Sequence, residues 1–209
     1  MQRKLAPRVS RRNAKGDLRL VAGLDAAFSP DGRTCLAAVV LWDRKTKLVR
    51  EQLVVGRPVR FPYIPGLLSF REIPTLLAAL RRLSTTPDVL MCDGHGLAHP
   101  RRFGIASHLG VVTALPSIGC AKSLLVGEAK VPGPRRGCRT ALRHQGETLG
   151  VVLRTQTGVN PVYVSIGHEI DLPTAVQVVL SSSTRYRLPE PTRLADRLVA
   201  LAKRHSASL

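Results

Sequence analysis

Two apolar runs that each end in a carboxylate, LRLVAGLD (residues 18–25) and DVLMCD (residues 88–93), decide how this sequence is interpreted. Each run is short, rich in Val and Leu, and followed by residues that turn the chain, which is typical of a buried strand. A carboxylate at the end of a buried strand is unfavourable unless a cation meets it. If the two strands lie side by side, Asp25 and Asp93 converge on one hard cation, most naturally Mg²⁺, which prefers oxygen ligands.

The composition points to a globular protein with a nucleic-acid partner. The chain has 209 residues, of which 44% are hydrophobic and 22% charged, as in one folded domain. It carries 32 Lys and Arg residues against 14 Asp and Glu residues, a net charge of +18. A high-GC genome would explain a preference for Arg over Lys, but not this net charge. The basic excess predicts binding to phosphates, and together with the paired carboxylates it indicates a metal-dependent nuclease.

Cysteine usage and hydropathy indicate where the protein acts. The four cysteines show no C-x-x-C spacing, and three lie within or beside apolar runs, which favours free buried thiols over disulfides or zinc. The basic N-terminus lacks the apolar segment of a signal peptide, and no stretch approaches the roughly 20 apolar residues of a membrane span. We therefore expect a soluble, cytoplasmic monomer without a membrane partner.

The pattern of apolar periodicity and turn residues predicts the order of elements. Residues 1–16 are expected to form a flexible basic arm, and residues 17–209 a single catalytic domain. Val131–Arg143 has no periodicity and is interpreted as a surface loop. The predicted strands are Leu18–Phe28, Thr34–Trp42, Lys47–Val55, Asp88–Asp93, Ser117–Ala121, and a hairpin of Leu149–Arg154 with Pro161–Ser165. The predicted helices are Ile73–Leu83, with Pro74 in its first turn, Phe103–Val112, Leu172–Leu180 and Thr192–Arg204.

This order predicts an α/β fold, in which helices flank a mixed β-sheet. The first three strands are separated by short turns and should form an antiparallel meander. In a ribonuclease H-like arrangement, the first strand and the strand after the first long helix are adjacent and parallel. That topology would place Asp25 beside Asp93, although periodicity alone does not establish strand order.

Three further charged residues have both a structural and a functional interpretation. Glu72 directly precedes the predicted helix, so it either caps the helix dipole or joins the acidic site, where it would bind a second cation or hold a water. Asp196 lies on the last helix, where pairing with a neighbouring Arg is the ordinary role. Lys122 ends an apolar strand and is either a surface lysine or a cation that offsets phosphate charge.

A proline-rich loop and a glycine-broken loop carry the remaining candidates. The prolines of FPYIP (residues 61–65) stiffen the chain and would hold Tyr63 outward as a wedge between stacked bases, the alternative being a core tyrosine. Gly94 and Gly96 would let the backbone approach a flipped base. His99 follows Asp93 by six residues, but a lone histidine is more often structural, and no role is assigned to His95.

Six stretches, in this order along the chain, resemble the endonuclease V family of deoxyinosine 3′ endonucleases. They cover nearly the whole chain after about residue 18, and as an ordered set they are highly specific. The stretches are VAGLD (residues 21–25), PYIPGLLSFRE (62–72), DGHGLAHPR (93–101), AKS (121–123), PVYVSIGH (161–168) and PEPTRLAD (189–196).

The resemblance implies a ribonuclease H-like fold and an Mg²⁺-dependent activity, with Mn²⁺ able to substitute. Cleavage is then expected at the second phosphodiester bond 3′ to deoxyinosine, leaving a 3′-hydroxyl and a 5′-phosphate. The implied catalytic residues are Asp25, Glu72, Asp93, Lys122 and His99. The implied metal ligands are Asp25, Asp93, Glu72 and Asp196. The implied nucleic-acid contacts are Pro62, Tyr63, Ile64, Gly94, Gly96 and Arg101.

Two alternatives to cleavage of DNA stay open at this point. Some relatives prefer inosine-containing RNA, and a contact with the 2′-hydroxyl would decide between the two substrates. A non-catalytic basic protein that binds nucleic acid would explain the net charge. It would not need three carboxylates, Asp25, Glu72 and Asp93, in a chain that is otherwise poor in acidic residues.

Overall fold

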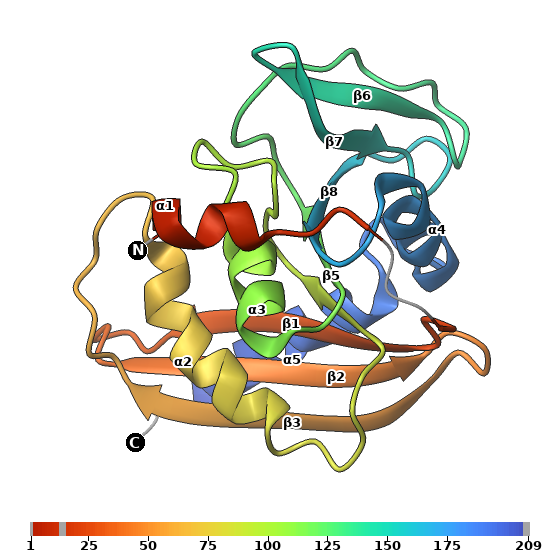
Figure 1. Ribbon diagram of the computed structural model, residues 1–209. Coiled ribbons are helices and arrows are strands. Elements are labelled where there is room, and N and C mark those ends of the chain that lie inside the picture. Colours follow the sequence, from red (N-terminus) through yellow and green to blue (C-terminus); the bar gives the residue numbers. More distant parts are fainter. Residues whose placement is uncertain (1, 13–15, 207–209) are drawn as a thin grey trace.

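A single eight-stranded sheet organises the computed structural model, which describes residues 2–12 and 16–206 (Figure 1). Its strand order is β3-β2-β1-β4-β5-β8-β7-β6. The pairs β1–β4 and β4–β5 are parallel, and all other neighbouring strands are antiparallel. The strands are β1 (Leu20–Phe28), β2 (Thr34–Asp43), β3 (Leu48–Pro58), β4 (Val89–Cys92), β5 (Ser117–Ala121), β6 (Arg139–His144), β7 (Glu147–Leu153) and β8 (Val162–His168).

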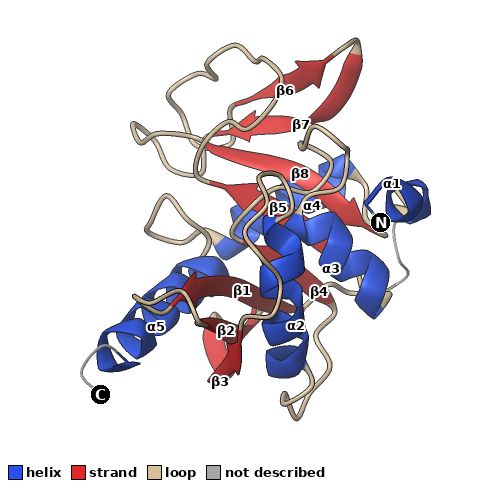
Figure 2. Ribbon diagram, turned by 90° about the vertical axis from the view of Figure 1, so that its left-hand side faces the viewer, coloured by secondary structure: helices blue, strands red, loops and turns tan. Residues whose placement is uncertain are grey.

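Helices cover both faces of this sheet, as Figures 1 and 2 show from two directions. Helices α2 and α3 pack on one face, where Leu76 of α2 lies in the same apolar cluster as Leu24 and Leu90. Helices α4 and α5 pack on the other face, and Val199 of α5 meets Val40 there. The helices are α1 (Gln2–Leu5), the 3₁₀ turn η1 (Ala6–Arg8), α2 (Leu68–Leu80), α3 (Ile105–Thr113), α4 (Leu172–Ser182) and α5 (Glu190–Ser206).

The central strands are apolar on both sides because both of their sides are covered. In β2, Val39 belongs to the cluster under α2, whereas its neighbour Val40 belongs to the cluster under α5. Every residue of β2 after Thr34 is buried, which explains its unbroken apolar sequence. The edge strand β3 is mostly exposed and correspondingly richer in charge.

Gly23 in β1 allows α5 to approach the sheet closely enough to reach the end of the strand. A Cβ at this position would lie 2.1 Å from the backbone carbon of Pro191, near the start of α5. Only a residue without a side chain fits there, since the obstacle is backbone rather than a movable side chain. This contact sets the distance between β1, which carries Asp25, and α5, which carries Asp196.

The beginning of α2 and the β6 strand were predicted incorrectly. Helix α2 begins at Leu68, so Pro74 lies inside the helix rather than in its first turn, and Glu72 is a helical residue. Contacts with α3 support the early turn: the ring of Phe70 lies 4.7 Å from that of His108. The predicted loop Val131–Arg143 contains most of β6, in which only Leu142 is buried, so apolar alternation is weak.

The described part of the N-terminal segment packs against the domain instead of projecting from it. The side chain of Gln2 is 4% exposed, and its amide donates to the carbonyl oxygens of Gly66 and Phe103. The backbone N–H of Ser10 donates to His168 Nδ1 at 3.2 Å, and the backbone N–H of Glu169 donates to the carbonyl oxygen of Ser10 at 2.8 Å. Residues 13–15 of the predicted arm lie outside the described residues. Within the described ranges, no helix combines the length and the apolar character that crossing a membrane requires.

Gly23→Ala tests the close approach of α5 to β1. We expect the free energy of unfolding to fall by about 2 kcal/mol or more, because the added methyl group must displace the backbone of α5. Chemical denaturation measures this change. Gly56→Ala in β3 is the matched control, since a Cβ there meets only side-chain methyl groups, of Leu36 at 3.2 Å and of Thr34 at 3.7 Å. Equal stability of the two variants would contradict this account of the packing.

Candidate metal centre and adjoining cavity

The parallel pairing of β1 and β4 brings the two predicted carboxylates together. Leu24 is paired with Cys92, and the backbone N–H of Asp93 donates to the carbonyl oxygen of Leu24 at 3.1 Å. Asp25, within β1, and Asp93, directly after β4, therefore lie at the same level on neighbouring strands. The topology predicted from the order of elements is confirmed.

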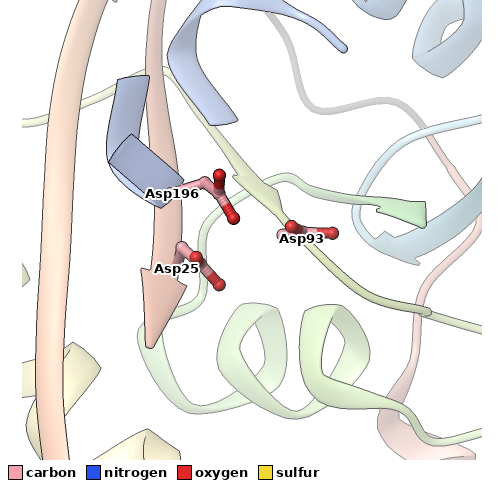
Figure 3. A group of neighbouring side chains, drawn as sticks. All are labelled: Asp25, Asp93 and Asp196. Carbon is pink, nitrogen blue, oxygen red and sulfur yellow. The ribbon is translucent and has the colours of Figure 1, made fainter. Parts of the chain in front are cut away.

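Helix α5 adds a third carboxylate to this pair. One oxygen each from Asp25, Asp93 and Asp196 lie within 4.8 Å of one another (Figure 3). All three residues are half-buried, so water screens their mutual repulsion only in part. Three convergent carboxylate oxygens suit a hard divalent cation, and this donor set fits the metal site that the sequence predicted.

Lys122, at the end of β5, supplies a positive charge to the cluster. Its Nζ lies 2.6 Å from Asp93 Oδ2 and 2.9 Å from Asp196 Oδ1. Burial lowers the pKa of Lys122, but the hydrogen bonds to Asp93 and Asp196 outweigh it and raise this pKa above its ordinary value. Lys122 is therefore charged, and it ties the strand ends to α5.

Glu72 stands beside the three aspartates rather than among them. It lies on α2 and lines the same cavity as Asp25 and Asp93, but outside the group of converging oxygens. Burial, reinforced by the charge of Asp25, raises the pKa of Glu72 to about 8. Burial and the charge of Asp93 raise the pKa of Asp25 to about 7. Both carboxyl groups are thus poised to release protons when a cation enters.

A cavity of about 560 Å³ opens directly from the acidic cluster. His99 in its wall is buried and accepts a hydrogen bond at Nδ1 from the backbone N–H of Arg101, at 3.1 Å. Burial and the nearby Arg101 lower the pKa of His99 to about 4, so the ring is neutral at neutral pH and carries its proton on Nε2. The wall also includes Tyr63, Leu68, Ser69, Gly94, His95, Arg101, Gly104, Ile105 and Leu125.

The two glycines of the Asp93–Gly96 turn have different surroundings. Gly94 lines the cavity, and a Cβ there would meet the Ile105 side chain at 2.8 Å. Gly96 is instead packed against β8, where a Cβ would lie 2.0 Å from the carbonyl oxygen of Ile166. The N–H of Gly96 donates to Ser165 Oγ at 2.9 Å, so this N–H is already engaged within the protein.

Arg71 is a residue of this region that the sequence interpretation missed. Its guanidinium lies 4.3 Å from the ring centroid of Phe28 and 5.8 Å from that of Tyr63, so it is stacked between two aromatic side chains. Tyr63 is 67% exposed, and its neighbours Pro62 and Ile64 are exposed as well. Arg71 precedes Glu72 in the sequence, but nothing in the spacing reveals the contact with Phe28.

The arginines near the cavity are already held by protein groups. Arg101 donates to the side chain of Gln2 at 2.8 Å and to the carbonyl oxygen of Gly66 at 3.1 Å. Arg102 binds Glu147 at 2.7 Å and donates to the carbonyl oxygen of His99, at 3.2 Å. These contacts fix loops around the cavity, which spacing in the sequence could not indicate.

The family model for endonuclease V matches residues 3–197. The chain belongs to the endonuclease V family. An endonuclease V from Roseiflexus sp. (strain RS-1) is 54% identical over 200 residues, covering 96% of this chain and 89% of the relative. A crystal structure of an endonuclease V from Streptomyces avermitilis superposes with a TM-score of 0.92 at 43% identity, covering 98% of this chain and 91% of the other.

A third relative was crystallised with nucleic acid. Endonuclease V from Ciona intestinalis, in complex with a 24-mer DNA containing an inosine followed by a ribo-adenosine, superposes with a TM-score of 0.85 at 25% identity. The alignment covers 98% of this chain and 95% of that one. Together these likenesses establish a nuclease with a ribonuclease H-like fold, which argues against the non-catalytic alternative.

The raised pKa values of Asp25 and Glu72 predict how stability depends on pH when divalent cations are removed. Their folded values, about 7 and about 8, exceed the ordinary values of 3.8 and 4.5, so the folded state binds more protons than the unfolded chain. The free energy of unfolding should therefore fall as pH rises from about 6.5 to about 8, because below that range buried histidines whose pKa is lowered to about 4, such as His99 and His108, act in the opposite sense. Thermal unfolding in EDTA across this range measures the effect.

Asp25→Asn should flatten this dependence, because an amide does not titrate. Asp17→Asn is the control, since the Asp17 side chain is 80% exposed and lies outside the residues that line the cavity. A divalent cation should raise the melting temperature more at high pH than at low pH. A slope that Asp25→Asn leaves unchanged would refute the assignment of these protons.

Proposed function

We propose that this endonuclease V acts in DNA repair and cleaves the second phosphodiester bond 3′ to deoxyinosine, leaving a 3′-hydroxyl and a 5′-phosphate. The observation that carries the proposal is the convergence of Asp25, Asp93 and Asp196 beside a cavity of about 560 Å³. The inosine-containing DNA bound by the Ciona relative supports the choice of substrate. Mg²⁺ is the proposed cofactor, and Mn²⁺ should replace it because both accept oxygen ligands.

The residues around the cluster divide the chemistry between them. When bound, Mg²⁺ supplies charge neutralisation at the phosphate and a water activated for in-line attack. Asp25, Asp93 and Asp196 would hold the ion. Lys122, which already spans two of these carboxylates, would offset charge on the scissile phosphate.

Glu72 is the proposed proton acceptor of the reaction. Its raised pKa of about 8 lies near neutral pH, where a carboxylate can take a proton from an attacking water and later release it. It lines the cavity next to Asp25 without belonging to the converging oxygens. An added cation would favour its ionised form. We therefore assign Glu72 to the water rather than to the first cation.

The cavity is the proposed site of the flipped hypoxanthine base. Its volume falls within the range of small-molecule sites, roughly 300–1,000 Å³. Hypoxanthine presents an O6 acceptor and an N1–H donor. Neutral His99 carries a donor at Nε2, which suits the O6 acceptor, and Gly94 would leave room for the ring.

Tyr63 is the proposed wedge that fills the gap left by the flipped base. It is exposed on a loop stiffened by Pro62 and Pro65, and the guanidinium of Arg71 lies over its ring, 5.8 Å from the centroid. Arg71 and Glu72 are consecutive in α2. The same turn of helix therefore carries both Arg71, which contacts the proposed wedge, and Glu72, the proposed proton acceptor.

We also propose that residues 17–209 form one catalytic domain and that the protein works as a cytoplasmic monomer. Cys35, Cys92 and Cys120 are free and buried, which suits a reducing compartment. Inosine-containing RNA is the alternative substrate. The ribo-adenosine that follows inosine in the Ciona complex favours testing it directly.

Cleavage of an end-labelled duplex with one deoxyinosine tests the function. The wild-type protein should nick the strand at the second phosphodiester bond 3′ to the lesion with Mg²⁺, and not with EDTA. Asp93→Asn should abolish nicking, and Glu72→Gln should lower kcat by about 10²- to 10⁴-fold while DNA binding persists. Asp17→Asn is the matched control and should be fully active.

An RNA strand of the same sequence with one inosine, run in parallel, ranks the two substrates. Faster cleavage of RNA than of DNA would replace the DNA-repair assignment with the ribonuclease alternative. If the protein binds both strands but nicks neither, the proposed activity is contradicted.

A further inference from the structure

A second cavity, of about 460 Å³, lies behind the loop that follows β5. Lys122, Ser123 and Leu124 line this second cavity, whereas the next residue, Leu125, lines the first. The loop 122–125 is therefore the partition between them. The other lining residues come from the 129–132 segment, from β7 and β8 with the loop between them, and from Arg187.

The partition is firmly held, so the two cavities have a fixed relation. His95 Nε2 donates to the carbonyl oxygen of Ser123 at 3.1 Å, which ties the loop to the wall of the first cavity. Arg187, from the wall of the second cavity, donates to the carbonyl oxygen of Lys122. The Nζ of Lys122 meanwhile contacts Asp93 and Asp196. Lys122 thus belongs both to the candidate metal centre and to the lining of the second cavity.

The lining of the second cavity suits a phosphodiester strand. Among the described residues that line it, four are cationic and none is a carboxylate. Lys130 is exposed, and Arg187 is held by the carbonyl oxygen of Pro161, at 2.9 Å. Leu124 and Val131 are 46% and 81% exposed, an apolar surface that a sugar or base can cover. Positive charge beside exposed apolar surface is the usual character of a groove that binds single strands.

Arg154 forms the floor of this cavity rather than a contact for the strand. Its guanidinium is buried and donates to the carbonyl oxygens of Pro132, at 3.0 Å, and Gly133, at 3.1 Å. It also donates to the carbonyl oxygen of Val159. These bonds brace the 131–133 segment, which forms one wall, against β7. The cavity is therefore a shaped part of the fold.

We propose that the second cavity, here called the exit groove, binds the nucleotide on the 3′ side of the cut. This rests on the proposed function. With the lesion base in the first cavity and the scissile phosphate at the metal centre, a strand followed in the 3′ direction passes Lys122 and enters the exit groove. Lys130 and Arg187 bind its phosphates, and the exposed surface of Leu124 and Val131 covers its sugar and base.

Substrates that differ only in length on the 3′ side of the cut test this groove. We expect kcat/KM in single-strand cleavage to rise severalfold as nucleotides are added there, until the groove is filled. Lys130→Ala should remove most of that gain and leave the shortest substrate unaffected. It should also reduce the slope of log affinity against log salt by about 1, as expected for one lost phosphate contact.

Two further variants make the test specific. Val131→Asp adds a carboxylate to the groove at an 81% exposed position and should remove the gain more completely. Lys45→Ala removes another exposed lysine, from the β2–β3 turn beside the start of β1, and should change neither the gain nor the slope.

The outcomes separate the two proposals. If the wild-type protein nicks at deoxyinosine but shows no gain with 3′ length, or if Lys130→Ala and Val131→Asp behave like Lys45→Ala, the exit groove is overturned and the proposed function stands. If the wild-type protein nicks no inosine-containing strand, both proposals fall. If kcat/KM of Val131→Asp still rises with 3′ length, the exit-groove proposal is also overturned, even when Lys130→Ala loses the gain.

Discussion

The repulsion among three carboxylates that converge beside the central strands is the constraint on which the rest of this structure depends. Asp25, Asp93 and Asp196 lie within 4.8 Å of one another, and Glu72 stands nearby. Such an arrangement is unfavourable unless positive charge is close, because burial weakens screening by water. Lys122 provides that charge by binding two of the three aspartates. In the proposed nuclease chemistry the same imbalance would attract the cation that the reaction requires.

The fold serves this constraint through a few close contacts. Parallel pairing of β1 with β4 aligns two of the carboxylates, and Gly23 lets α5 approach far enough to add the third. Helix α2 contributes Glu72 from the opposite face of the sheet. Elements from both faces of the sheet thus meet around Asp25 and Asp93. The site is a property of the sheet's topology as much as of its acidic residues.

The sequence predicts the centre of this arrangement better than its edges. Val21–Leu24 of β1 and all of β4 are buried, so these two apolar runs and the aspartates that follow them were recognisable. Strand β6 was missed because Leu142 is its only buried residue, and α2 begins earlier than predicted because contacts with α3 support its first turn. The sequence indicated Lys122 as a candidate, but it could not show that Lys122 pairs with Asp93 and Asp196, because these residues come from distant segments. The stack of Arg71 between Phe28 and Tyr63 depends wholly on tertiary structure.

The position of Lys122 has a consequence for the protein when no metal is bound. Its ammonium group spans strand and helix, joining Asp93 to Asp196, and so acts as a built-in counter-ion for the ligands. The three carboxylates could then keep their places whether or not the proposed metal ion is bound. An incoming metal ion would then only replace the contacts that the Lys122 ammonium group makes with Asp93 and Asp196. The protein would not first have to rearrange the strands and the helix that carry these carboxylates.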